Sequence, residues 1–216
     1  MAAQYVGILR APTRLAFPRS ITLQKIPRGS GRFDVVFWTE FRDEGFKSLR
    51  IVRELLARVS GPASSLHDAI GEFTILANQY APVLATAANI VSGDMRLWLC
   101  FEQPSDGETF AGKQFSQSYD AGPQGLPTGS RWLDEGVGLA CLRCFMKRGP
   151  DEARLQRAIK QYQQALLHWG PGSETLAVAH LWIAIEALTK VIERRHRGSL
   201  TSDQLAEKWL SSTSNG

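Results

Sequence analysis

The chain has 216 residues, of which 44% are apolar and 21% are charged, values close to globular averages that exclude a disordered or fibrous chain. Its three cysteines, odd in number and unevenly spaced, exclude a secreted disulfide framework and favour a reducing, cytoplasmic location. The net charge is +4, and the excess of basic residues lies in the N-terminal part, because residues 1–60 hold 11 basic and 5 acidic side chains.

Short strands are expected to dominate the first hundred residues. Segments 3–9, 21–26 and 33–41 are rich in β-branched and aromatic residues and are separated by prolines and a Gly29-Ser30-Gly31 turn. Residues 95–102 alternate between more and less apolar side chains, which predicts a further strand.

Two helices are predicted between these strands. Residues 46–59 repeat apolar side chains at three- and four-residue steps, which is typical of an amphipathic helix, and Gly61-Pro62 should end it. A second helix is expected from Ser64 or Ser65 to Tyr80, with Pro82 interrupting it.

The second half reads as helical. The Gly-, Pro- and Ser-rich stretch 104–129 predicts a boundary between an α+β region, 1–129, and a helical bundle, 130–216. Helices are expected around Cys141 and Cys144, from Pro150 to Trp169 and from Glu174 to about Arg195, with a short fourth over 199–210. The fold class is therefore α+β, with a mixed strand and helix region packed on the bundle.

The helix from Glu174 to Arg195 is apolar nearly all round its middle, so it should be the central and most buried helix. Trp182, with Trp169 and Trp209 elsewhere in the bundle, is expected in the core. Trp38 and Trp98 have the opposite parity from the better-packed face of their strands. They mark either a partner surface or a second covered face.

No complete catalytic, metal-binding or cofactor motif is present, and we expect no catalytic residue, metal or cofactor. Cys141-x-x-Cys144 falls inside a predicted helix on its apolar stripe, which favours core packing over redox or zinc chemistry. His180 and Glu186 lie on the helix that should be buried. Each then needs a partner, either backbone or an arginine of a neighbouring helix, or else a catalytic role.

Arginines precede the first acidic residue, Asp34, and form a candidate nucleic-acid-binding set: Arg10, Arg14, Arg19, Arg28 and Arg32. A solvated basic face is the alternative interpretation. A transit peptide would have the same composition, but the alternation in 21–26 favours a strand. No window holds 18 to 20 uncharged apolar residues, so we expect no membrane insertion.

Part of the C-terminal region resembles a known family. Arg157-Ala158, Tyr162, Ala165-Leu166, a glycine-proline break and the run His180 to Leu188 are similar to the helical core of HEPN-type domains, particularly the ApeA-like group that follows an α+β region. The resemblance implies a helical bundle that often forms homodimers, found in bacterial toxin, antiphage and RNA-processing systems and sometimes acting as a metal-independent ribonuclease.

That ribonuclease activity requires an arginine followed, after four to six residues, by a histidine, and none of the four histidines has one at that distance. Arg194, Arg195 and Arg197 surround His196 with the right residue types at the wrong spacing. We therefore expect a non-catalytic binding or regulatory protein of a bacterial stress or antiphage defence system, homodimeric and cytoplasmic, with RNA or an acidic protein as candidate partner and no membrane. The alternative is an RNA-directed enzyme that uses the basic face or this arginine cluster.

Overall fold

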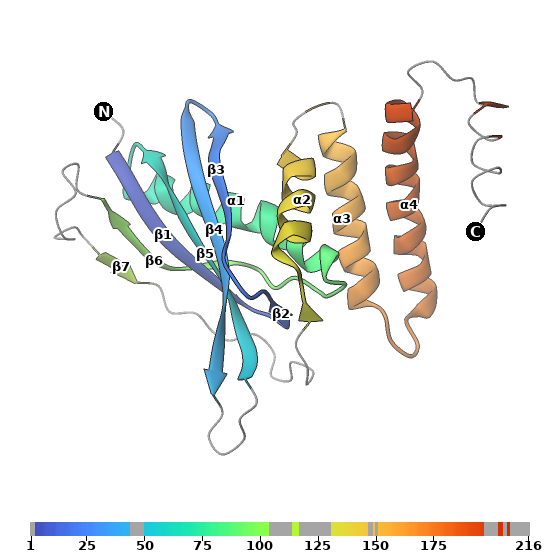
Figure 1. Cartoon of the computed structure of the whole chain (residues 1–216), viewed down its shortest axis with the longest axis horizontal. Helices are drawn as coiled ribbons and strands as arrows, with labels where there is room; N and C mark the ends of the chain where they lie inside the picture. The colour runs from blue at the N-terminus through green and yellow to red at the C-terminus, as the bar shows by residue number, and fades with distance from the viewer. Residues whose placement is uncertain are drawn as a thin grey trace. The chain divides into compact units, whose positions relative to one another are not determined.

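The computed structural model describes residues 3–43, 50–103, 114–116, 131–146, 149, 151–196, 203–204 and 207. The chain divides into two compact units, Met1–Met146 and Lys147–Gly216 (Figure 1). The sequence placed the boundary earlier, at residues 129/130. The helix that follows that point groups with the first unit instead.

The first unit is built on a six-stranded antiparallel sheet. Its strands are β1 (Ala3–Pro12), β3 (Ile21–Arg28), β4 (Gly31–Asp43), β5 (Arg50–Ala63), β6 (Arg96–Glu102) and β7 (Gln114–Ser116), in the order β3-β4-β5-β1-β6-β7. The short strands β2 (Leu15–Ala16) and β8 (Arg131–Trp132) pair in parallel beside it. The mixed α+β class is confirmed, and so are the strands predicted over 3–9, 21–26, 33–41 and 95–102.

The amphipathic helix predicted over 46–59 is wrong, because Arg50–Ala63 is strand β5. This strand lies between β4 and β1, and it has buried apolar side chains on both faces although α1 covers only one of them. Leu55, Ala57 and Val59 are buried on one face and Leu56 on the other. A strand apolar on both faces loses its two-residue alternation, so its periodicity can imitate that of a helix.

Helix α1 (Leu66–Ala87) covers one face of the sheet and lies behind it in Figure 1. It starts where expected, and Ser65 caps it, since the Ser65 side chain accepts a hydrogen bond from the Asp68 backbone N–H at 3.1 Å. Gly7 of β1 makes room for the helix, because a Cβ there would lie 2.6 Å from the Phe73 ring. Pro82 does not interrupt α1. Burial of Tyr80, Val83, Leu84 and neighbouring alanines outweighs the lost backbone hydrogen bond.

Helix α2 (Glu135–Met146) packs on α1 and β3 through Gly138, Leu142 and Phe145. A Cβ at Gly138 would lie 2.8 Å from Ile21, so this glycine brings the two elements together. The predicted buried stripe of Cys141 and Cys144 is therefore displaced by one residue. Cys144 is exposed and Cys141 only part-buried. Apolar periodicity could not reveal a contact face set by a residue without a side chain.

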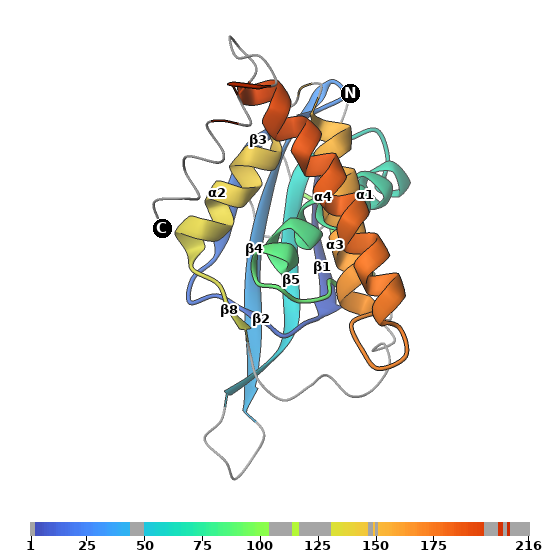
Figure 2. The same ribbon diagram turned by 90° about the vertical axis from the view of Figure 1, so that its right-hand side faces the viewer.

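In the second unit, α3 (Glu152–Leu167) and α4 (Glu174–His196) form an antiparallel hairpin. The two helices lie side by side in Figure 1, and α4 lies in front of α3 in Figure 2. Alanines dominate its interior: Ala158, Ala165, Ala177, Ala184 and Ala187, together with Val191 and Gln163, are buried. Most of the predicted fourth helix, 199–210, lies outside the described residues.

The expectation that α4 is buried nearly all round is wrong for the described residues. Only its alanine side packs on α3, and Trp182 is 71% exposed. Trp169, expected in the core, is also exposed, and Trp209 lies outside the described residues. The small alanines of α4 fill its contact with α3. The large apolar side chains of α4 therefore have no partner in this hairpin.

Candidate functional site

The face of the sheet opposite α1 is the main candidate site of the first unit. Strand parity places Val36 and Trp38 of β4, Leu56 and Arg58 of β5, and Ile8 and Arg10 of β1 on this open face. Among the described helices of this unit, α1 and α2 pack on the sheet, and both contact its other side. Leu56 is buried by its neighbours, whereas Arg58, in the middle of the face, is exposed.

An arginine and a tryptophan are paired on this face. The Arg10 guanidinium carbon lies 5.0 Å from the centre of the Trp98 ring, a cation–π contact, and one of its nitrogens lies 3.6 Å from a carboxylate oxygen of Glu54. Trp98 reaches this position because β6 has a bulge there, where Ile8 pairs with Leu99 but Leu9 pairs with Leu97. The indole is 37% exposed.

A row of side chains crosses the sheet through this pair. Trp38 lies opposite Leu56, Leu56 lies opposite Arg10, and Arg10 covers Trp98. The sequence left open whether the two tryptophans mark a partner surface or a second covered face. In the described part of this unit they lie on the face that no helix covers.

The arginines predicted as a nucleic-acid-binding set do not gather in one patch. Arg10 is on the open face and Arg32 is exposed at its end, whereas Arg28 pairs with Glu72 of α1, on the covered side. Arg14 is part-buried between β1 and β2, and Arg19 is exposed in the loop before β3. Arg58 was missed as a candidate because its strand was interpreted as a helix.

One arginine of the cluster at the end of α4, Arg194, forms an ion pair within the hairpin. Arg194 donates to Asp151, the residue before α3, at 2.9 Å. This ion pair ties the end of α4 to the start of α3. The side chain of Arg195 and all of Arg197 lie outside the described residues, so the cluster proposed for the alternative enzyme is not assembled by the residues described.

His180 and Glu186, predicted to be buried together, have different environments. The Nδ1 of His180 donates to Oε1 of Gln161 on α3 at 2.6 Å, and its ring stacks on His168 with centroids 5.6 Å apart. The histidine is part-buried, and its partner comes from a neighbouring helix, although it is a glutamine. The prediction for Glu186 is wrong. It lies on the exposed side of α4, so its carboxylate needs no protein partner.

Groups of three or more metal-ligating side chains do not occur among the described residues. By length and composition, Glu174–Arg194 is the one described segment that could cross a membrane. Glu186, Lys190 and Glu193 share one side of this helix, and a charged side chain near a membrane centre costs about 2.5 to 3.5 kcal/mol.

No family model matches the chain, and neither a curated protein nor a solved structure is significantly similar to it. Its function is therefore inferred from the residues of the two units themselves.

Proposed function

We propose that this chain is a non-catalytic binding protein that holds single-stranded RNA on the open face of its sheet and acts in regulation. The observation that carries the proposal is the row Trp38, Leu56, Arg10 and Trp98, which sets an arginine between two indoles on a face that no described helix of the first unit covers.

The chemistry of this row suits an unpaired nucleic acid strand. Bases without a pairing partner stack on aromatic rings whatever their sequence, and each such contact is worth about 1 to 3 kcal/mol. Guanidinium groups supply the charge that attracts phosphates, and Arg58 and Arg32 are exposed on the same face. Arg10 is held in place by Trp98 and Glu54, so it needs little reordering to meet a ligand.

The biological setting belongs to the same proposal. The HEPN-like run on α3 and α4 supports a role in a bacterial stress or antiphage defence system, where RNA is a frequent ligand. The alternative function, an RNA-directed enzyme, would draw on the same open face or on Arg194, Arg195 and Arg197. The engagement of Arg194 by Asp151 favours the binding role.

Titration with a fluorescently labelled single-stranded RNA tests the proposal. Trp98→Ala should weaken binding roughly tenfold, because it removes one stacking surface worth about 1 to 3 kcal/mol. The matched control is Trp132→Ala, which removes an indole that is 64% exposed but lies on β8, outside this face. Equal losses in the two variants would contradict the proposed site.

The salt dependence gives an independent readout. Arg58→Gln should reduce the slope of log affinity against log salt by about one, the effect of losing one phosphate contact. Arg28→Gln, on the covered side, should leave the slope unchanged. If RNA does not bind but an acidic polypeptide does, and Trp98→Ala abolishes that binding, the ligand class is wrong and the face is a protein-binding surface. RNA cleavage by the purified protein would establish the enzyme alternative.

A further inference from the structure

We infer that α4 pairs in parallel with α4 of a second copy of the chain, through a stripe of five residues: Val178, Leu181, Ile185, Leu188 and Ile192. This inference concerns the second unit alone and does not depend on the RNA proposal. It rests on the spacing of these residues, on their chemical types and on their exposure in the hairpin.

The spacing of the stripe is that of a coiled coil. Its members follow one another at steps of three, four, three and four residues, which is the a and d pattern of a heptad repeat. Four of the five are large and exposed, with Val178 and Ile185 at 59% and 56%. Leu181 is part-buried.

The side of α4 that meets α3 has the same spacing but different contents. Ala177, His180, Ala184, Ala187 and Val191 also follow steps of three and four residues, and the alanines and valine are buried. Helix α4 therefore carries two neighbouring heptad faces. Small residues fill the face that α3 occupies, and large residues fill the open one.

The residue types at the open face select the occupant and its direction. β-Branched residues stand at every a position (Val178, Ile185 and Ile192) and leucine stands at both d positions, the distribution that favours parallel two-stranded coiled coils. In a parallel pair each residue meets its own counterpart. The stripe is therefore complementary to the same stripe of a second copy without any adjustment of register.

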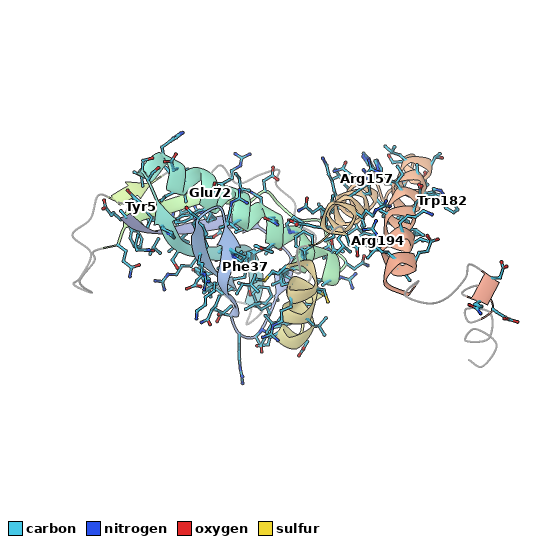
Figure 3. All side chains as sticks on the ribbon, turned by 90° about the horizontal axis from the view of Figure 1, so that it is seen from above. Tyr5, Phe37, Glu72, Arg157, Trp182 and Arg194 are labelled. Atoms are coloured by element: carbon cyan, nitrogen blue, oxygen red, sulfur yellow. The ribbon has the colours of Figure 1, made fainter. Side chains whose placement is uncertain are left out.

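The flanking positions hold no charge that would oppose this pairing. With Val178 at a, the e positions are Trp182 and Thr189 and the g positions are Ala177, Ala184 and Val191. Glu186, Lys190 and Glu193 stand at b and f, away from the contact. Figure 3 shows Trp182 on the side of α4 turned away from α3, so α3 does not obstruct the approach of a second helix.

The available area limits the strength of the dimer. Four side chains that are 37% to 59% exposed, the part-buried Leu181 and the exposed Trp182 together offer roughly 400 to 500 Å² per copy. This is near the lower limit of about 1,000 Å² in total for a specific interface. We therefore expect a dimer that dissociates in the micromolar range. Because no ion pair contributes at the e and g positions, its affinity should change little with salt.

Cysteine cross-linking of the full chain tests both the contact and its direction. The background carries Cys141→Ser and Cys144→Ser and keeps the buried Cys100. In a parallel pair, Val178→Cys and Ile192→Cys should each form an intermolecular disulfide alone. Ile183→Cys, on the same helix outside the stripe, should not. A disulfide formed by a mixture of the Val178→Cys and Leu188→Cys chains, with none formed by Val178→Cys alone, would indicate an antiparallel pair, in which a positions face d positions, and would overturn the inference.

Light scattering over a concentration series supplies the second measurement. Ile185→Asp should raise the dissociation constant by about 100-fold, because it places two carboxylates at the centre of an apolar contact. Ile183→Asp should leave the constant unchanged, and circular dichroism checks that both variants fold. A wild-type chain that stays monomeric at high micromolar concentration would overturn the inference. Binding to anionic vesicles through Trp182 and Ile185 without dimerisation would overturn it as well.

Discussion

The thiol of Cys100 makes the free energy of unfolding of the first unit fall as the pH rises through the alkaline range. Cys100 lies on β6 opposite Gly7, facing α1, and is fully buried. Burial raises the pKa of this thiol from 9.0 to about 11, because the ionised form would be desolvated.

The sign of the effect follows from where each state loses its proton. Below pH 9 both the folded and the unfolded chain hold the proton, so the thiol does not change the free energy of unfolding. Between about pH 9 and 11 only the unfolded chain ionises, which lowers the free energy of unfolding by roughly 2 to 3 kcal/mol. Urea titrations from pH 8 to 11 should show this decline in the wild type and a smaller one in Cys100→Ala. Parallel pH profiles for the two proteins would contradict it.

Glycines on β1 and α1 have opposite roles, although both occur inside regular elements. Gly7→Ala would force a methyl group against the buried Phe73 ring, which we expect to cost about 1 to 3 kcal/mol of unfolding free energy. Gly71 is exposed in the interior of α1 and an added Cβ would meet nothing within 4 Å, so Gly71→Ala should stabilise the unit by about 0.5 to 1 kcal/mol. Chemical denaturation of the two variants checks the pair. A loss of stability in both variants would contradict the explanation that Gly7, unlike Gly71, is needed because Phe73 of α1 packs closely on it.

Elements with one buried face could be predicted from the sequence, and elements whose burial depends on distant partners could not. The alternation of 21–26 and the β-branched and aromatic composition of 33–41 predicted strands β3 and β4, and the helix start expected at Ser64 or Ser65 is that of α1. Strand β5 was misread because Leu56 is buried on the face opposite Leu55 and Ala57, so the alternation is lost. That burial comes from side chains of neighbouring strands, which a local window does not contain. The same holds for α2, whose contact face is set by Gly138.

The candidate sites could also be predicted only in part, because local patterns identified the residues and distant elements determined their contacts. Parity alone separated Trp38 and Trp98 from the packed face, but the pairing of Arg10 with Trp98 depends on a bulge that brings two distant strands into register. For α4, the sequence indicated that its apolar circumference exceeds what one helix can cover. The alanines Ala158, Ala165 and Ala184 determined which part α3 covers, so Trp182 and Ile185 lie outside the contact.

At the scale of the whole molecule, the two proposals together predict bivalent binding. A dimer formed through α4 carries two open sheet faces, so a long RNA strand can engage both and gain affinity from the high effective concentration of the second site. Ile185→Asp should therefore weaken binding of a long strand at least about tenfold and leave binding of a strand too short to reach both sites unchanged. Binding assays with a series of RNA lengths measure this. An equal loss at every length would show that the substitution disturbs the sheet face itself.

The strand order also has a consequence for how the chain is made. Strand β1 lies in the middle of the sheet, between β5 and β6, yet it leaves the ribosome before either neighbour exists. The hairpin of β3 and β4, joined at Gly29 and Ser30, can close locally while β1 waits, its Val6, Ile8 and Leu9 and its backbone hydrogen-bonding groups unpaired. During synthesis this segment is therefore a natural target for chaperones that bind apolar extended chains, until Arg50–Ala63 emerges to cover one edge.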